Sequence, residues 1–138
     1  VSLIRGMKVA LDMIDKIGIE KVWARTALLA KATRTAAEAI GLKVYSSQPS
    51  DSVTGIWYPQ GIDDAFRKAL EKTYGCSVAG GQDDIKGKVF RVSHMGYVDP
   101  LDTIGLIAAT EYTLAKLGVK VKIGAGVAAA TAVLRDWE

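Results

Sequence analysis

One arginine stands in a pattern that could bind an anion. Arg91 lies in residues 88–94, where the composition and alternation are typical of a β-strand. Alternation places Arg91 on one strand face with Val89 and Ser93. Its planar guanidinium can bind a carboxylate through two parallel hydrogen bonds, which a lysine ammonium cannot do. The residues alone leave two interpretations open: an arginine that binds a carboxylate, or a surface or salt-bridged strand residue.

Other reactive side chains have equally plain structural explanations. His94, the single histidine, ends the same segment and could act as a general base, but no second histidine or nearby carboxylate accompanies it. A packing or turn role is its alternative. Cys76 has no neighbour that marks a reactive thiolate, so a small buried hydrophobe is the preferred interpretation. One histidine and one cysteine provide no ligand set for structural zinc and no disulfide framework.

Paired glycines and paired aspartates are weak signals here. Gly80 and Gly81 could form a phosphate-binding loop, but the segment lacks the Walker spacing and the dinucleotide fingerprint. A predicted strand follows them rather than a helix, which favours plain loop geometry. Asp63 is an N-cap candidate, and with Asp64 it stands at a predicted helix start, where negative charge is favourable. The pair at residues 83–84 is expected to be solvated, and neither pair makes a metal site by itself.

Five helices and several short extended segments must position these residues. Three-four spacing of apolar residues predicts helices over residues 2–17, 20–40, 64–74, 100–117 and 125–137, and extended segments over 42–45, 53–58, 77–79 and 88–94. Asp99 followed by Pro100 is a strong helix start. Glu111 interrupts an apolar stripe and is expected to face solvent or a partner. Short neighbouring strands predict an α/β chain of the α+β layer type: a small, mostly antiparallel sheet with helices on one face, preceded by a long helix.

Composition excludes several classes of protein. Of the 138 residues, 49% are hydrophobic and 24% charged, which argues against disorder. The net charge of 18 − 15 = +3 has no like-charge block, so a nucleic-acid partner is not expected. The longest uncharged run, residues 123–134, is too short for a membrane helix of ~20 residues. A single cysteine favours a reducing compartment, taken as the cytoplasm. Because the chain opens on Val1 rather than a methionine and its first residues already look helical, we expect an earlier part to be missing.

Read as an ordered set, five stretches resemble the C-terminal part of class V aminotransferases, in the branch with alanine–glyoxylate, serine–glyoxylate and serine–pyruvate aminotransferases. The resemblance covers nearly the whole chain with natural spacing. The stretches are Val22-Trp23-Ala24-Arg25, Ala79-Gly80-Gly81-Gln82, Lys86-Gly87-Lys88-Val89-Phe90-Arg91-Val92-Ser93-His94-Met95-Gly96-Tyr97-Val98, the helix from Asp102 to Leu117, and Gly124-Ala125-Gly126-Val127-Ala128-Ala129-Ala130.

The resemblance implies a fold-type I enzyme, homodimeric and dependent on pyridoxal 5′-phosphate. In that family, the arginine that matches Arg91 binds the substrate carboxylate; Ser93 stands where glycine is common. The family's cofactor-binding lysine lies well upstream of this arginine, and no lysine before Arg91 has the family's lysine context. We therefore expect no catalytic, cofactor-binding or metal-binding residue in this chain, and Arg91 as its substrate-binding residue.

These implications define one hypothesis and a rival. Residues 1–18 would be a remnant helix of the large cofactor-binding domain, and residues 19–138 the small domain that closes over the substrate. The complete enzyme would transfer an amino group from alanine, serine or a similar amino acid to a 2-oxo acid such as glyoxylate or pyruvate, while this chain alone would be inactive. The rival is a free-standing regulatory module that binds a small molecule without catalysis.

Overall fold

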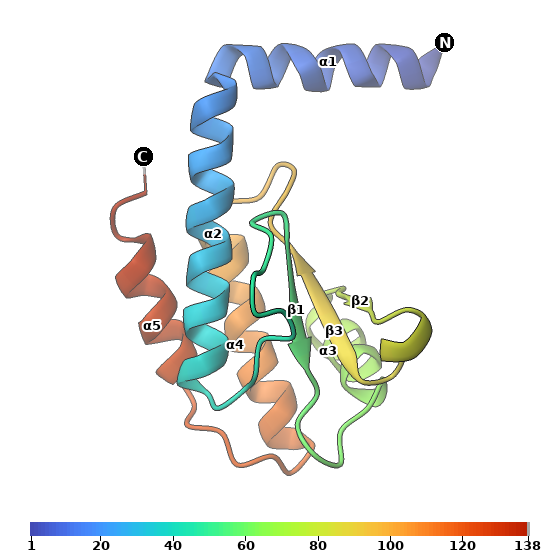
Figure 1. The fold of residues 1–138 in the computed structure, drawn as a ribbon, viewed down its shortest axis with the longest axis vertical. Coiled ribbons are helices and arrows are strands. Elements are labelled where there is room, and N and C mark those ends of the chain that lie inside the picture. The colour runs from blue at the N-terminus through green and yellow to red at the C-terminus, as the bar shows by residue number, and fades with distance from the viewer. Residues whose placement is uncertain (138) are drawn as a thin grey trace.

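A computed structural model describes residues 1–137 of the chain. Figure 1 shows its elements, and every predicted helix is confirmed, with a start within one residue of the prediction. The last helix ends three residues earlier than predicted. The helices are α1 (Ser2–Ile17), α2 (Ile19–Ala39), α3 (Ala65–Tyr74), α4 (Pro100–Lys116) and α5 (Ala125–Leu134); the strands are β1 (Val53–Trp57), β2 (Ala79–Gly80) and β3 (Val89–Ser93); and a 3₁₀ turn covers Asp83–Ile85.

The strands form an antiparallel sheet in the order β1-β3-β2, so β3 is central. The extended segment predicted at residues 77–79 is displaced: β2 begins at Ala79 and includes Gly80, because Gly80 pairs with Phe90. Residues 42–45 run beside β1 but form only an isolated bridge, between Val44 and Ile56. The chain then turns away, as the Ser46 hydroxyl accepts the Gln48 N–H.

Helices cover one face of this sheet, as predicted. Figure 1 shows α3 and α4 behind the strands and α2 beside them, and a buried cluster with residues from all three helices packs against the sheet. On β1 and β3 the buried positions facing this layer are Thr54, Ile56, Phe90 and Val92. Phe90 is 1% exposed and its ring lies 4.9 Å from that of Phe66 on α3. This layer therefore supplies the main hydrophobic core beneath β3.

A second core joins α2 to α5. Small side chains let these two helices approach closely: Ala32, Ala36 and Ala130 are at most 1% exposed. At Gly126 an added Cβ would lie 2.9 Å from a Glu111 carboxylate oxygen and 3.1 Å from the Ala36 carbonyl oxygen, so a side chain there would crowd this contact. The alanine-rich surface predicted for the last helix is thus a packing surface.

Glu111 corrects the expectation that it faces solvent or a partner. It is 1% exposed, on the inner side of α4, and its carboxylate meets the start of α5. One oxygen accepts the Gly124 N–H at 2.6 Å, and the other accepts those of Gly126 at 2.7 Å and Val127 at 3.3 Å. The first N–H groups of a helix have no partner within the helix and favour negative charge, so Glu111 caps α5 from a distance in sequence.

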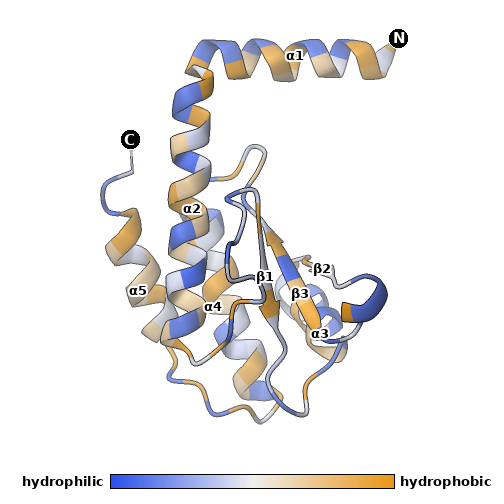
Figure 2. Ribbon diagram, in the orientation of Figure 1, coloured by the Kyte–Doolittle hydropathy of each residue, from blue (hydrophilic) through white to orange (hydrophobic). Residues whose placement is uncertain are grey.

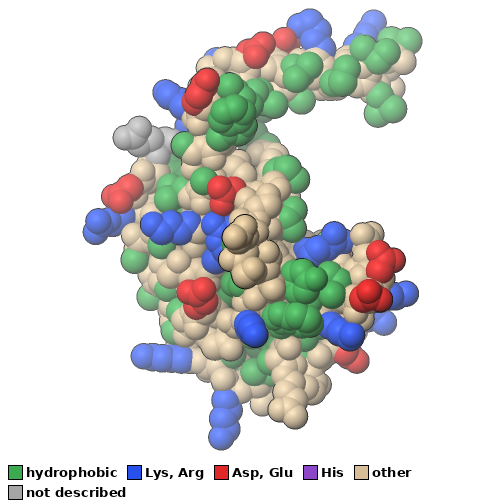
Figure 3. Space-filling model, in the orientation of Figure 1, with side chains coloured by type: hydrophobic (Ala, Val, Ile, Leu, Met, Phe, Trp, Pro, Cys, Tyr) green, Lys and Arg blue, Asp and Glu red, His purple; other side chains and the backbone are tan. Residues whose placement is uncertain are grey.

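The N-terminal helix α1 packs on no core. Gly18, with φ of 91°, joins it to α2 in the backbone region that glycine tolerates best, and α1 projects away from the body (Figure 1). Hydrophobic and hydrophilic residues alternate along it (Figure 2), and Leu3, Ile4 and Met7 are 88%, 66% and 59% exposed. In Figure 3 hydrophobic side chains spread along α1 between charged ones. An amphipathic helix thus stands without a partner in the described residues.

The described part of the chain contains no helix that is both long and apolar enough to cross a membrane.

Candidate functional site

The sheet places Arg91 in its centre, on the face away from the helix layer. The cross-strand partners of Arg91 are Gly55 on β1 and Ala79 on β2. Directly opposed residues in antiparallel strands point to the same face, so Arg91 stands between two of the smallest residues. Arg91 as a whole is half-buried. This confirms the strand position and the alternation predicted for Arg91.

The guanidinium is anchored at one nitrogen and open at the other two. Nε donates a hydrogen bond to the Gly80 carbonyl oxygen at 2.8 Å. Within residues 1–137, no hydrogen bond or ion pair engages the two Nη groups of Arg91, which we call the Arg91 fork. A carboxylate matches such a fork with two parallel, charge-assisted hydrogen bonds. The arrangement is that of a pre-oriented anion donor, and the salt-bridge interpretation of Arg91 is excluded for these residues.

Two aromatic rings border this face. Tyr45 and Trp57 lie with ring centroids 5.2 Å apart. A Cβ added to Gly55 would be 3.2 Å from the Tyr45 Cβ and 3.5 Å from a methyl group of Val89. The space beside Arg91 therefore depends on glycine at position 55, because a larger residue there would press on Tyr45.

The glycine pair at residues 80–81 serves the sheet. Gly81 donates its N–H to the Val89 carbonyl at 2.7 Å, and Gly80 provides the acceptor for Arg91. A Cβ at Gly81 would lie 2.1 Å from the Ile85 carbonyl oxygen, which no side chain could tolerate. Close backbone approach thus explains the pair, and the phosphate-loop interpretation is excluded because the Gly81 N–H is already used.

A triangle of polar residues behind β2 was not foreseen. Asp64 accepts hydrogen bonds from Arg67 Nε at 3.1 Å and from the Tyr58 hydroxyl at 3.0 Å. The Arg67 bond lowers the pKa of the Asp64 carboxyl, and Asp64 raises the pKa of the Arg67 guanidinium. Burial, then the bond to Asp64, raises the pKa of Tyr58. The i, i+3 spacing of Asp64 and Arg67 was the available signal. The N-cap of α3 is Asp64, one residue after the predicted Asp63, although the Asp63 carboxylate does accept the Ala65 N–H at the helix start.

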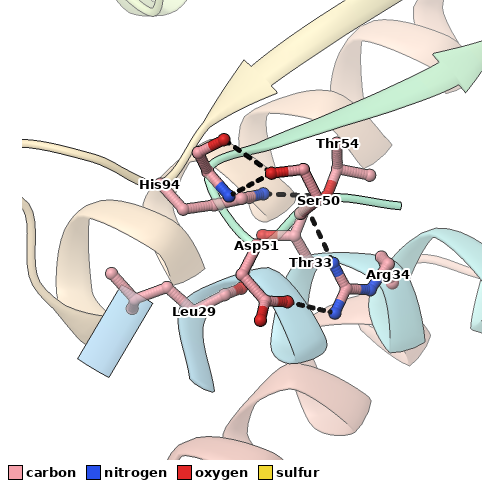
Figure 4. Close-up of polar contacts among 8 residues, drawn as sticks. Leu29, Thr33, Arg34, Ser50, Asp51, Thr54 and His94 are labelled. Carbon is pink, nitrogen blue, oxygen red and sulfur yellow. Dashed lines mark hydrogen bonds and ion pairs between the residues drawn. The ribbon is translucent and has the colours of Figure 1, made fainter. Parts of the chain in front are cut away.

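His94 lies on the helix side of the sheet and forms a structural contact. It is 3% exposed, and its Nε2 is 2.8 Å from the Thr54 hydroxyl on β1 (Figure 4). The backbone N–H of His94 donates to the Ser52 carbonyl oxygen at 2.9 Å and so extends the β1–β3 pairing. Burial, then the nearby positive charge of Arg34, lowers the pKa of His94 to about 4. A neutral, buried imidazole on the face opposite Arg91 supports the packing interpretation over general-base chemistry.

The remaining sequence candidates stay apart from Arg91. Cys76 is half-buried and its thiol lies 3.7 Å from the Tyr74 carbonyl oxygen. Asp83 and Asp84 are exposed, as expected of solvated carboxylates. A cavity of about 290 Å³ lies between the first half of α2 and the loop of residues 94–99, with His94 among its lining residues, and Arg91 does not line it. The candidate site is therefore the part of the sheet face around Arg91, apart from this cavity.

The described residues do not suit pyridoxal phosphate. That cofactor is held through a lysine, with further groups around its phosphate and ring. Every lysine of the chain is exposed, and none lines the cavity between α2 and the loop of residues 94–99. The described residues therefore offer no enclosed lysine, and no catalytic step through the cofactor is derived from them.

Comparisons with known proteins agree with the resemblance seen in the sequence. No family model matches the chain. The serine–glyoxylate aminotransferase of Methylorubrum extorquens is 41% identical over 138 residues, which cover 97% of this chain and 34% of that protein. A protein named soluble hydrogenase, small subunit, from Synechococcus is 38% identical, with 97% of this chain and 36% of that protein covered.

A solved structure extends this likeness to three dimensions. The crystal structure of pyridoxamine–pyruvate aminotransferase from Mesorhizobium loti matches with a TM-score of 0.93 and 38% identity, over 98% of this chain and 36% of that one. The chain thus spans about a third of the length of the relatives it matches. The chain belongs to the class V aminotransferases, and it corresponds to their C-terminal region.

Proposed function

We propose that residues 19–138 act as the substrate-closing domain of an aminotransferase that uses pyridoxal 5′-phosphate, with Arg91 binding the substrate carboxylate. The Arg91 fork carries this proposal: its Nε is fixed by Gly80, its two Nη groups are free in the described residues, and small residues flank it on an open face. A purely structural arginine would be expected to use its terminal nitrogens within the fold.

The proposed reaction moves an amino group from alanine, serine or a similar amino acid to a 2-oxo acid such as glyoxylate or pyruvate. Both substrates carry the carboxylate that the Arg91 fork fits. The cofactor, when bound, supplies the electron sink for this chemistry. Arg91 contributes binding and orientation, because a carboxylate held at two points fixes the direction of the substrate's Cα. We place the cofactor-binding residues outside this chain.

We assign residues 1–18 to the large cofactor-binding domain. Helix α1 supports this assignment, since it has an exposed apolar face and contributes no buried residue to the cores described here. Exposed apolar patches of this kind mark contact surfaces. A homodimeric enzyme in the cytoplasm is the assembly and location we propose, on the strength of the family resemblance.

The rival proposal is a regulatory module that binds an amino acid without catalysis. The gene upstream of the codon for Val1 separates the two. The enzyme requires a reading frame that continues upstream through a lysine-bearing domain, since about two thirds of each relative lies outside the match. A start codon and ribosome-binding site directly before Val1 would support the module. We expect no transamination by the 138-residue chain alone.

The decisive test replaces Arg91 in the enzyme that carries this chain. Arg91→Ala is expected to lower kcat/KM by about two to four decades, because two charge-assisted hydrogen bonds of ~1.5–3 kcal/mol each are lost at ~1.4 kcal/mol per decade. Arg91→Lys should recover only part, since an ammonium cannot form the planar pair. Single-turnover measurements of the first half-reaction provide the comparison.

Cofactor titration of the same variants supplies the control. Cofactor affinity should be nearly unchanged in both, because the proposal places those contacts elsewhere. Near-normal kcat/KM in Arg91→Ala would reduce Arg91 to a structural strand residue. Loss of cofactor from that variant would show that the assigned role is of the wrong kind.

A further inference from the structure

We propose that Arg67 is a positioning residue for Arg91, which it orients through strand β2. The proposal rests on the function proposed above, in which Arg91 binds the substrate carboxylate. Arg67 belongs to α3, on the helix side of the sheet, and its hydrogen bonds within residues 1–137 go to Asp64 and Val78 rather than to Arg91. Its effect on binding would therefore be indirect.

The orientation of Arg91 depends on where β2 lies. The Gly80 carbonyl oxygen, 2.8 Å from Nε, is the one hydrogen-bond partner of the Arg91 side chain in residues 1–137. Strand β2 has only two residues, pairs with β3 alone, and lies at the sheet edge. A short edge strand has few ladder bonds of its own, so contacts from its other side contribute much of its placement.

Arg67 supplies those contacts. Its Nη1 donates to the Val78 carbonyl at 3.2 Å, directly before β2. Its guanidinium also lies flat against Gly80, since a Cβ added there would be 3.1 Å from Arg67 Cζ. The Gly80 carbonyl oxygen thus accepts the hydrogen bond from Arg91, and the missing side chain of Gly80 leaves room for the Arg67 guanidinium. The two arginines are connected through this single residue.

Arg67 is itself held rigidly. The Asp64 carboxylate accepts hydrogen bonds from Arg67 Nε at 3.1 Å and from Arg67 Nη2 at 3.4 Å. This two-point pairing restricts rotation of the guanidinium. Tyr58 donates its hydroxyl to the same carboxylate at 3.0 Å and packs its ring on Phe90, 5.4 Å away. The connection therefore runs from the core under β3, through Asp64 and Arg67, to the residue that fixes Arg91.

Two substitutions separate positioning from charge. Arg67→Gln removes both the charge and the two-sided contact, whereas Arg67→Lys keeps the charge but cannot bind Asp64 at two points and Val78 at a third. Asp64→Asn keeps Arg67 but weakens the two-point pairing that holds its guanidinium. This variant replaces Arg67→Gln in the experiments if Arg67→Gln folds poorly. Arg34→Gln is the matched control, since Arg34 also pairs an aspartate, Asp51 at 3.0 Å, but has no contact with β2.

The first measurement uses the 138-residue chain and NMR of the arginine Nε–H groups. A proton that is hydrogen-bonded to a carbonyl exchanges slowly with water, so the Arg91 signal reports its bond to Gly80. We expect its exchange to speed up about tenfold or more in Arg67→Gln and Arg67→Lys, and to stay unchanged in Arg34→Gln. Unchanged exchange in a folded Arg67→Gln chain would overturn the proposal.

The second measurement is steady-state kinetics of the enzyme that carries this chain, with L-serine and glyoxylate. We expect Arg67→Gln and Arg67→Lys to raise KM about tenfold, with a smaller change in kcat, since slight misplacement of a binding group has effects of this order. A normal KM in Arg67→Lys with a raised KM in Arg67→Gln would show that only charge matters, and would overturn the positioning role.

Failure of the two proposals can be told apart. If Arg91→Ala retains near-normal KM and kcat, the proposed function fails, whatever Arg67 does. If Arg91→Ala is impaired while Arg67→Gln and Asp64→Asn leave both KM and the Arg91 exchange rate normal, the function stands and the positioning role of Arg67 fails. A lowered melting temperature with normal KM and normal exchange would assign Arg67 to stability alone.

Discussion

The two faces of the sheet differ in how far the hydrogen-bonding capacity of their polar side chains is used within the fold. On the helix side, the described residues leave no buried side-chain nitrogen or oxygen without a partner: Glu111 accepts three backbone N–H groups, and His94 bonds Thr54. On the open side, Arg91 uses Nε, and both Nη groups are free of partners within residues 1–137. A saturated polar group stabilises a fold, whereas an unsaturated one at the surface is available to a ligand. The contrast predicts that mutations on the two faces will affect different properties.

The neighbours Phe90 and Arg91 give the sharpest test of this contrast. Phe90→Ala is expected to lower the free energy of unfolding by about 3–5 kcal/mol, because a fully buried ring leaves a cavity. Arg91→Ala should lower it by about 1–2 kcal/mol, since one half-buried hydrogen bond from a charged group is lost. Urea titration of the 138-residue chain measures both. A larger loss for Arg91→Ala than for Phe90→Ala would reverse the roles of the two faces.

Glu111 tests the covered side with a charged residue. Glu111→Ala is expected to cost about 2–4 kcal/mol of stability, because N–H groups at the start of α5 lose their acceptor. Glu111→Gln should cost less, since one oxygen remains. Glu38→Ala, at an exposed glutamate on α2, is the matched control and should stay within about 0.5 kcal/mol. Equal small effects at both positions would contradict the capping role.

His94 makes the stability of the covered side depend on pH. Its pKa is about 4 in the fold against 6.5 ordinarily, so the unfolded chain binds the proton more tightly. Stability is therefore complete above about pH 7 and falls as the pH drops from 6.5 toward 4, by about 2 kcal/mol at about pH 5. Urea titrations of the wild type and of His94→Gln across this range measure the effect. A slope that persists unchanged in His94→Gln would assign it to other groups.

Helix α1 should show the smallest effect on folding and a distinct effect on association. Replacing Leu3, Met7 and Leu11 by serine is expected to change the free energy of unfolding by less than about 0.5 kcal/mol, since these residues pack on no core. The unmodified chain should self-associate through this helix, and the variant should not. Sedimentation equilibrium over a range of concentrations measures the association of both chains, and urea titration measures the change in the free energy of unfolding. A strictly monomeric wild type would rule out self-association through α1.

Much of the architecture could be predicted because its signals are local. Helix starts and ends follow from residues adjacent in the chain, such as Asp99 before Pro100, where the Asp99 carboxylate accepts the N–H groups of Leu101 and Asp102. The face of Arg91 follows from strand alternation in the same way. The prediction that Arg91 binds a substrate carboxylate came from the resemblance of the surrounding residues to a known family. Residue spacing alone left the role of Arg91 open.

Tertiary structure decided what depends on residues far apart in sequence. Glu111 was expected at the surface because its neighbours on α4 do not reveal that the start of α5, 13 residues on, needs an acceptor. The role of Gly80 between Arg67 and Arg91 likewise required the packing of α3 behind β2. Periodicity and capping act over a few residues, so sequence determined the elements and the face of Arg91. Burial and hydrogen-bond satisfaction act through space, so only the folded chain determined which polar groups are used up and which remain free.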